Sequence, residues 1–344
     1  MPFSGADLGL LALSFLAPFV LMLLVMPSYI RYLIRRGKVV DDVHKQPATK
    51  VPSPVGPVVF AAAIIGEAVV YLAYGSVVPL AIMGVAAVAF AVGIWDDLSE
   101  LGGMAKPLLL LFAAAPLVVS VILKPDLYEA RLTLPILGPT GEHFTIYTLL
   151  VIAAFPIVAN AFNMMDAFNG EVSGFAFLST LALTFGVVLH AYFTSGFSLA
   201  RVAATLPLLA IAAGFYVFNR YPSRAFDGNS GSLVFGAMFA ALAITGGVEV
   251  AAVVAMIPAI LNSFYILSSV RGFVERRKMA ARPTFMGKDG RLYATPDSSA
   301  PITLARMMLL AGPLSEKKLV GEVLQLTAAA CVLSVMTSIL TWVF

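Results

Sequence analysis

Residues 78–97 read VPLAIMGVAAVAFAVGIWDD, an uncharged run that stops at two adjacent aspartates. A helix needs about 20 mostly apolar residues to cross the hydrocarbon of a bilayer, so this stretch has the length of a membrane span. The next apolar run, 107–123, begins directly after Lys106. Polar groups at membrane depth are costly and usually functional. The stretch therefore predicts a spanning helix whose end carries chemistry.

The composition indicates an integral membrane protein. Of 344 residues, 60% are hydrophobic and 12% are charged, and the mean hydropathy is +0.93. A soluble domain has roughly 45–50% apolar and 25% charged residues. The net charge is only +3 and the basic residues form short clusters, which argues against nucleic-acid binding. Cys331 is the single cysteine, so neither a disulfide nor a cysteine-based metal site can form within one chain.

The apolar runs predict an all-α polytopic membrane protein with about ten transmembrane helices in a single domain, 1–344. The first run continues into basic residues, which favours an uncleaved span over a signal peptide. Between the ninth and tenth spans, residues 271–320 form the one sizeable insertion. The expected spans are 8–30, 57–75, 78–95, 107–123, 145–162, 172–193, 199–218, 232–246, 248–270 and 322–343.

The basic residues predict the orientation. With ten spans, nineteen of the 22 Lys and Arg residues lie in the loops that follow odd-numbered spans. The other loops contain only Lys124, Arg131 and Arg201. Since Lys and Arg are enriched in cytoplasmic loops, the odd-numbered loops are expected in the cytoplasm and both termini outside.

The acids and amides gather on the same predicted cytoplasmic face. Acids at helix ends can simply solvate them, but four loops on one face favour a site. The residues concerned are Asp41, Asp42, Asp96, Asp97, Asp166, Asp227, Asn160, Asn163, Asn169 and Asn229.

The Asp96-Asp97 pair with Lys106 suits a divalent cation and phosphate. Hard oxygen ligands bind Mg²⁺, and a lysine neutralises phosphate charge. Neighbouring residues point in different directions on a helix. One carboxylate is therefore expected to face a metal or substrate, and the other to hold the loop or a base. A site of this kind at the membrane predicts a substrate with a lipid part and a phosphate part.

Two further loops carry polar side chains. In 160–174, NAFNMMDAFNGEVSG, Asn160 and Asn163 are one helical turn apart and can face one way, although asparagine near a helix end is often only a cap. In 218–233, FNRYPSRAFDGNSGSL, Gly228 and Gly231 precede an apolar helix. Backbone N–H groups there would form a phosphate site, and a turn without a ligand is the alternative.

Five groups of residues, in order along nearly the whole chain, carry a resemblance to a known family. They are Asp42, Lys45, Pro52 and Gly56; Asp96, Asp97 and Lys106; Asn160, Asn163, Asn169, Gly170 and Gly174; Phe226, Gly228, Gly231 and Ser232; and Pro283, Gly290 and Leu292, followed by Gly312, Pro313 and Glu316. In this pattern the chain resembles the polyprenyl-phosphate N-acetylhexosamine-1-phosphate transferases (glycosyltransferase family 4), above all their archaeal and eukaryotic UDP-GlcNAc–dolichyl-phosphate branch.

The resemblance implies ten spans, a cytoplasmic active site and dependence on Mg²⁺, with Mn²⁺ as an alternative. It implies transfer of a sugar-1-phosphate, GlcNAc-1-phosphate first, from a UDP-sugar to a polyprenyl or dolichyl phosphate, with release of UMP. This would be an early membrane step of glycan assembly. The expected partners are the two substrates, the lipid bilayer and a second copy in a homodimer, and the expected location is the cell membrane of an archaeon.

The resemblance also implies roles for individual residues. Asp96, Asp97 and Lys106 are expected to be catalytic, with either aspartate as the base. Asn169 and Asn229 are expected to bind the metal, with Asp227 as a substitute. The expected substrate-binding residues are Asp42, Lys45, Asn160, Asn163, Asp166, Gly228, Ser230, Arg276, Arg277 and Arg282.

Two departures from the family pattern keep alternatives open. Asn229 stands where the family has a metal-binding aspartate, and Ala280-Ala281 stand where its dolichyl branch has a His-Arg pair. A relative with another donor or acceptor, and a non-catalytic lipid-binding member, therefore remain alternatives. A transporter is a third, but transporters place polar groups near the midplane rather than on one face.

Overall fold

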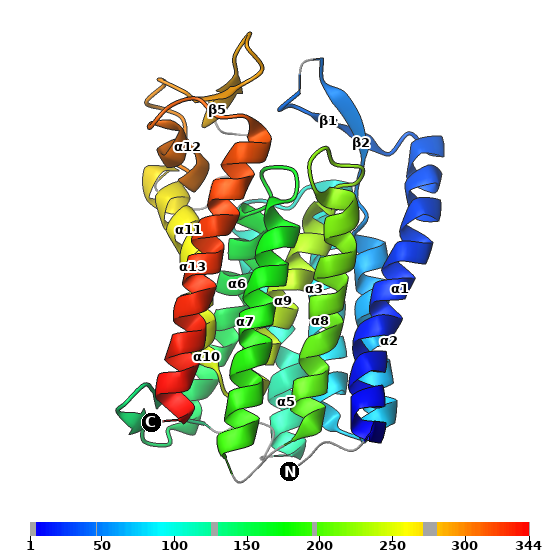
Figure 1. Cartoon of the computed structure of the whole chain (residues 1–344), viewed down its shortest axis with the longest axis vertical. Coiled ribbons are helices and arrows are strands. Elements are labelled where there is room, and N and C mark those ends of the chain that lie inside the picture. Colours follow the sequence, from blue (N-terminus) through cyan, green and yellow to red (C-terminus); the bar gives the residue numbers. More distant parts are fainter. Residues whose placement is uncertain (1–4, 46, 125–129, 195–197, 271–280, 344) are drawn as a thin grey trace.

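The computed structural model is a bundle of long helices (Figure 1). It describes residues 5–45, 47–124, 130–194, 198–270 and 281–343. The helices are α1 (Gly5–Arg35), α2 (Gly56–Tyr74), α3 (Val77–Ser99), α4 (Ala105–Leu110), the 3₁₀ turn η1 (Leu111–Ala114), α5 (Ala115–Leu123), α6 (Phe144–Met164), α7 (Glu171–Phe193), α8 (Leu199–Asn219), α9 (Gly228–Gly246), α10 (Glu249–Ala255), α11 (Ile257–Val270), α12 (Leu304–Leu309) and α13 (Glu316–Trp342).

Short antiparallel hairpins account for the strands of the described residues. Val40 is paired with Val51 in the first hairpin, and Phe285 with Tyr293 in the third. The strands are β1 (Val39–Asp42) with β2 (Thr49–Pro52), β3 (Thr133–Leu134) with β4 (Gly138–Pro139), and β5 (Thr284–Met286) with β6 (Leu292–Ala294).

The predicted fold class is confirmed. Within the described residues, nine helical segments are long and apolar enough to cross a membrane, and α10 with α11 makes a tenth if that bent pair is one span. Gly75 and Gly247 end α2 and α9 in left-handed backbone, with φ of 63° and 64°, at turns that the sequence indicates.

Several predicted spans differ in detail: the tenth, expected at 322–343, begins at Glu316, and the ninth and eighth also differ. The ninth, expected as one helix over 248–270, bends by 66° between α10 and α11. Pro258, the second residue of α11, cannot donate a backbone hydrogen bond and its ring crowds the preceding turn, so it breaks the helix there. The eighth, expected at 232–246, begins four residues earlier at Gly228 because the polar turn before it is already helical.

α9 is the central helix of the bundle. It packs against α2, α3, α6, α7 and α8, and every residue from Ser230 to Gly246 is buried. Small residues make this packing close: a Cβ built at Gly93 of α3 would lie 2.5 Å from the Cα of Ser230. Backbones that approach so closely are typical of membrane helix pairs. The start of α9 is therefore held rigidly among its neighbours.

The polar loops lie at one end of the bundle. The β1–β2 and β5–β6 hairpins project side by side there, while the first residues of α1 and the last of α13 lie at the opposite end (Figure 1). A small apolar cluster fixes the β5–β6 segment to the bundle, since Leu292 packs with Phe168 and Leu319. Leu292 also pairs with Leu314 through backbone hydrogen bonds of 2.8 and 3.2 Å. The segment before the last span is thus docked on the helices that carry the polar loops.

Candidate active site

Asp97, at the end of α3, caps the start of α9. Its Oδ1 accepts hydrogen bonds from the backbone N–H and side-chain amide of Asn229, at 2.8 and 3.1 Å. Its Oδ2 accepts from the backbone N–H and hydroxyl of Ser230, at 2.9 and 2.6 Å. A carboxylate at a helix N-terminus accepts hydrogen bonds from N–H groups that have no partner within the helix. Its negative charge is also stabilised by the positive end of the helix dipole. Asp97 therefore joins α3 to α9 and positions the residues around it.

Asp96 forms an ion pair with Lys106. The Nζ of Lys106 lies 2.6 Å from Oδ2 of Asp96, whose side chain is buried. Oδ1 of Asp96 accepts a hydrogen bond of 2.7 Å from the backbone of Leu101, which shapes the loop between α3 and α4. The ten-residue separation in sequence thus becomes direct contact. As expected, the two adjacent aspartates have different partners.

Asn229 connects these groups to α6. Its Oδ1 accepts hydrogen bonds from Lys106 Nζ at 3.1 Å and from Asn163 Nδ2 at 2.8 Å. The Nδ2 of Asn163 also donates to the hydroxyl of Ser232 at 2.8 Å. We call Asp96, Asp97, Lys106, Asn163 and Asn229 the Asp96 cluster. It brings together residues of α3, α4, α6 and α9 at the polar end of the bundle.

A second group, the Asp42 cluster, consists of Asp42, Lys45, Asn169 and Glu316. Lys45 Nζ forms ion pairs with Oδ2 of Asp42, at 3.3 Å, and with Glu316. The side-chain amide of Asn169 donates to Asp42 at 3.0 Å, and its backbone N–H donates to Glu316 at 2.9 Å. The cluster therefore ties the β1–β2 loop to the start of α7 and the start of α13.

The Asp42 cluster also has the geometry of a metal centre. Ligand atoms of Asp42, His44 and Glu316 all lie within 4.8 Å of one another, so this trio could bind a metal ion. Lys45, however, already supplies a positive charge to both carboxylates. The Nζ of Lys45 also lies 4.1 Å from the centre of the Tyr221 ring, in a cation–π contact.

Asp227 is the residue directly before α9. It is fully buried, and neither of its carboxylate oxygens has a hydrogen-bond donor among the described residues. Burial, and then the nearby carboxyl of Asp166, raise the pKa of Asp227 well above its ordinary value. Asp97 adds to the same effect from the other side. We call Asp166 and Asp227 the Asp227 pair.

Some predicted site residues have other surroundings. Asn160 donates its amide to the carbonyl of Pro156 on its own helix, at 2.7 Å, rather than toward Asn163. The N–H groups expected to bind phosphate at the start of α9, including that of Ser230, are occupied by Asp97. Arg276 and Arg277 lie outside the described residues.

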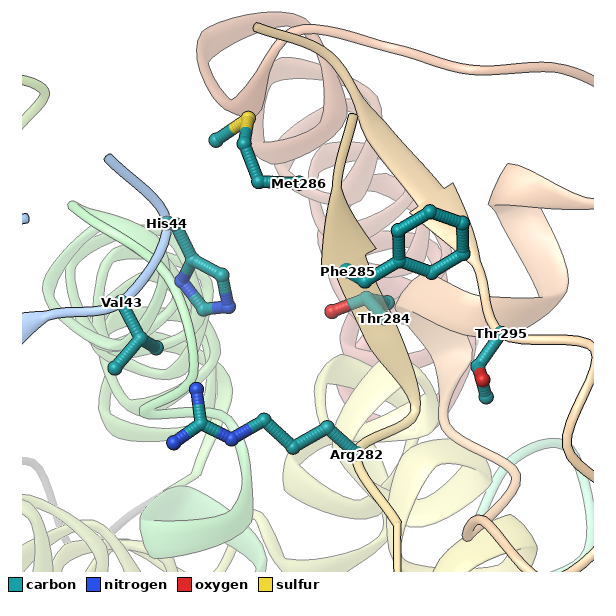
Figure 2. A pocket seen from close by; sticks show the side chains of 7 residues that line it. All are labelled: Val43, His44, Arg282, Thr284, Phe285, Met286 and Thr295. Carbon is teal, nitrogen blue, oxygen red and sulfur yellow. The ribbon is translucent and has the colours of Figure 1, made fainter. Parts of the chain in front are cut away.

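Arg282 lines a pocket of about 380 Å³ beside the Asp42 cluster. Figure 2 shows its guanidinium pointing toward the ring of His44 across the opening, with β5 on the far side. The His44 ring in turn stacks on Phe168, at 4.5 Å between ring centres. The lining residues are Val43, His44, Arg282, Thr284, Phe285, Met286 and Thr295. The pocket therefore offers two nitrogen-bearing side chains and two hydroxyls next to a buried ion cluster.

Three residues of the site received no role from the sequence. They are His44, Ser232 and Glu316, and each is placed by contacts that span more than 60 residues or join separate loops. The available signals were the motifs of the family resemblance, which contain Ser232 and Glu316 but not His44. Nothing in the local sequence shows that Glu316 meets Asn169, 147 residues away.

Comparison with known proteins shows which proteins this chain is similar to. Residues 79–247 match the model of glycosyl transferase family 4. A relative from Saccharolobus solfataricus, provisionally named a UDP-N-acetylglucosamine–dolichyl-phosphate N-acetylglucosaminephosphotransferase, is 27% identical over 305 residues, which cover 85% of this chain and 88% of the relative. A Dictyostelium discoideum protein of the same name is 25% identical over 66% of this chain and 60% of its own length.

A bacterial relative extends the comparison. The phospho-N-acetylmuramoyl-pentapeptide-transferase of Nitratiruptor is 25% identical over 297 residues, 77% of this chain and 81% of the relative. Residues 79–247, which match the family model, contain the whole Asp96 cluster. Residues 79–247 therefore carry a glycosyl transferase family 4 domain, and the resemblance and enzyme class predicted from the motifs are confirmed.

Proposed function

We propose that this protein transfers GlcNAc-1-phosphate from UDP-GlcNAc to a polyprenyl phosphate of the dolichyl type, releasing UMP. The names of its archaeal and Dictyostelium relatives support this donor and acceptor. The observation that carries the proposal is the Asp96 cluster. It places a carboxylate–lysine pair and two asparagine amides at the membrane-edge end of the bundle, where a lipid phosphate can meet a soluble nucleotide.

The proposed reaction is a nucleophilic displacement at phosphorus. An oxygen of the lipid phosphate attacks the β-phosphorus of the UDP-sugar, and a new phosphorus–oxygen bond forms. The bond from the β-phosphorus to the oxygen shared with the α-phosphate breaks, and that oxygen leaves with UMP. Catalysis of such a transfer consists mainly of positioning the reactants and stabilising charge.

We assign Lys106 and Asp96 to the binding and deprotonation of the acceptor, the lipid phosphate. An incoming phosphate competes with Asp96 for the ammonium of Lys106, which lies 2.6 Å from that carboxylate. Once Lys106 contacts the phosphate, Asp96 can accept any proton that the lipid phosphate still carries. The second pKa of a phosphate monoester is about 6, so this role matters most at neutral pH and below.

Asp97 is assigned a positioning role. Both of its oxygens are used by four hydrogen bonds to Asn229 and Ser230, so its charge is committed to the start of α9. Loss of Asp97 would free the helix start that carries Asn229. The sequence leaves open which of the two aspartates is the base. The commitment of Asp97 to α9 favours Asp96.

The proposal includes a divalent cation, Mg²⁺ first. The residues of this face fit one, because Asp227 presents two buried oxygens without a donor and the nearest neighbouring groups are acids. When bound, the cation would offset the negative charge that gathers on the pyrophosphate in the transition state.

The nucleotide end of the donor is assigned to the Asp42 cluster and the adjoining pocket. Asn169, with Asp42 and Lys45, offers fixed polar groups for a nucleoside. Arg282 and His44 extend the site with groups that suit phosphate or sugar oxygens. We place this end of the bundle in the cytoplasm, because nineteen of the 22 Lys and Arg residues belong to the loops that the sequence assigns to that side.

The test is transfer of radiolabelled GlcNAc-1-phosphate to dolichyl or undecaprenyl phosphate by protein purified in detergent. We expect a chloroform-soluble labelled product with Mg²⁺ and none with EDTA. A Lys106→Met variant, checked for folding by size-exclusion chromatography, should lose most of the activity. Absence of product from UDP-GlcNAc and from other UDP-sugars, with folded protein, would contradict the proposal.

A further inference from the structure

Asp227 differs from the other acids at this end of the bundle. Asp96 has Lys106, Asp97 has four hydrogen-bond donors, and Asp42 and Glu316 share Lys45. Asp227 is more deeply buried than these acids, and no basic or amide side chain among the described residues donates to its oxygens. A buried carboxylate without a partner is strongly unfavourable. Such a group indicates that something outside the chain completes its surroundings.

The backbone around Asp227 is fixed from both sides. Its carbonyl accepts a hydrogen bond of 2.9 Å from the backbone N–H of Gly56, and the carbonyl of Phe226 accepts one of 2.9 Å from Val55. Gly228 has a φ of +70°, and a Cβ on Gly231 would lie 2.4 Å from the Cβ of Asp227. These two glycines allow the chain to turn into α9 over the aspartate. The position of the side chain is therefore built into the fold.

The nearest charged neighbours of Asp227 are acids. Asp166 lies close enough for a contact between the two carboxyl groups, and Asp97 lies within electrostatic reach. Glu171, at the start of α7, is a further buried acid near Asp166. Negative groups held together in a buried site repel one another unless a cation or a proton lies between them.

We infer that Asp227 and Asp166 hold the divalent cation of the proposed reaction, and that Asn229 and the Asp42 cluster do not. This inference rests on the proposed function for the identity of the reaction, but the binding can be measured without it. Mg²⁺ is typically bound through one or two carboxylates, and completes its six ligands with water and substrate phosphates. The Asp227 pair supplies those two carboxylates, one of them fully buried.

The other candidate ligands are already in use. The side-chain oxygen of Asn229 accepts from Lys106 and Asn163, which occupies both of its lone pairs. The carboxylates of Asp42 and Glu316 are neutralised by Lys45, so a cation there would have to displace an ammonium group. Among the described residues, no ammonium group has to be displaced from the carboxylate of Asp227.

The experiment measures Mn²⁺ binding to the whole protein in detergent by electron paramagnetic resonance, with and without UDP. The variants are Asp227→Asn and Asp166→Asn, with Asp42→Asn for the competing cluster and Asp41→Asn as a surface control. We expect each of the first two to weaken Mn²⁺ binding on the order of 10–100-fold or more, the range seen when supporting groups of metal sites are lost. In the absence of UDP, the Asp41 and Asp42 variants should bind Mn²⁺ within about threefold of the unchanged protein, because their side chains lie outside the pair.

Several outcomes would overturn the inference. One is wild-type protein that binds no Mn²⁺ with or without UDP; another is an Asp227→Asn protein that binds it normally. A loss confined to Asp42→Asn would assign the cation to the Asp42 cluster. If Asp227→Asn does not fold, as judged by circular dichroism and size-exclusion chromatography, the Asp166→Asn protein decides. Because no turnover is involved, a positive result stands even if the sugar donor proves to be different.

Discussion

Two groups of buried acids lie at the same end of the bundle and differ in what neutralises them. In the Asp42 cluster a lysine from the same loop contacts both carboxylates, and an asparagine donates to each. In the Asp227 pair, the buried carboxylate has neither lysine nor donor among the described residues. The comparison shows how similar side chains can serve different ends. The Asp42 cluster is neutralised within the protein and joins three segments. The Asp227 pair is suited to a cation from outside the chain.

The largest effect is expected from Asp227→Asn. The change keeps the size of the side chain and removes its negative charge, so the cation should bind weakly. A bound divalent cation supplies several kcal/mol of transition-state stabilisation, so kcat/KM at low Mg²⁺ should fall about 100-fold or more. The assay is sugar-phosphate transfer over a Mg²⁺ titration. If the activity of the variant stays within about twofold of the unchanged protein at every Mg²⁺ concentration, the proposed difference between the Asp42 cluster and the Asp227 pair is wrong.

Lys45→Met tests the same comparison from the other side. Removing the lysine leaves two buried carboxylates unpaired, and breaking a buried ion pair costs about 3 kcal/mol. Unfolding by SDS in mixed micelles, followed by circular dichroism in EDTA, should show this loss.

The Lys45→Met protein should also gain a second Mn²⁺ site, because Asp42, His44 and Glu316 then meet without an ammonium group. Added Mn²⁺ should recover part of the lost stability. A Lys45→Met/Glu316→Gln double variant, in which fewer charges are left unpaired, is the control and should gain less from Mn²⁺. Unchanged stability and no second site in the single variant would show that Lys45 does not determine the character of the cluster.

Asn229→Asp is expected to have a smaller effect. The new carboxylate would face Oδ1 of Asp97, to which the Asn229 amide now donates at 3.1 Å. Loss of that hydrogen bond and the added repulsion should reduce kcat about tenfold, equivalent to roughly 1–2 kcal/mol. Steady-state transfer kinetics provide the measurement. A large rise in activity would instead show that residue 229 is a weakened metal ligand and that Asp227 is not its replacement.

The smallest expected effect belongs to Arg282→Ala. The guanidinium lines the pocket next to the Asp42 cluster, away from the Asp96 cluster. Its loss should raise the KM for the UDP-sugar up to about tenfold and leave kcat within twofold, as expected when only binding is weakened. Arg291→Ala is a matched control, because Arg291 is exposed and lies at the same hairpin but outside the pocket. A fall in kcat for Arg282→Ala alone would place it at the reacting groups.

The sequence predicts the helices well because long apolar runs leave few alternatives in a membrane. Its errors lie where side-chain chemistry overrides the pattern. Pro258 breaks a run that is uniformly apolar, and the polar turn from Gly228 is helical because Asp97 caps it. Asn160 and Asn163 share the spacing of one helical turn, but only Asn163 meets a partner on another helix.

The candidate site was predicted in its parts but not in its connections. The Asp96–Lys106 contact follows from two neighbouring span ends, and the structure brings these residues together. The joining of Asp42, Lys45 and Asn169 to Glu316 depends on how distant loops dock. The lack of a basic or amide donor for Asp227 among the described residues depends on every neighbouring side chain at once. Neither the docking of these loops nor the surroundings of Asp227 can be predicted from a local stretch of residues.

The most direct test of the proposed function follows the two phosphates of the donor separately. UDP-GlcNAc carrying ³²P at the β-position is incubated with the protein, dolichyl phosphate and Mg²⁺, and the products are separated into lipid and water. The account predicts that the label enters the lipid product and that unlabelled UMP appears in equal amount. Label that remains in the water phase as UDP, beside a sugar-bearing lipid, would show transfer of the sugar alone and would contradict the account.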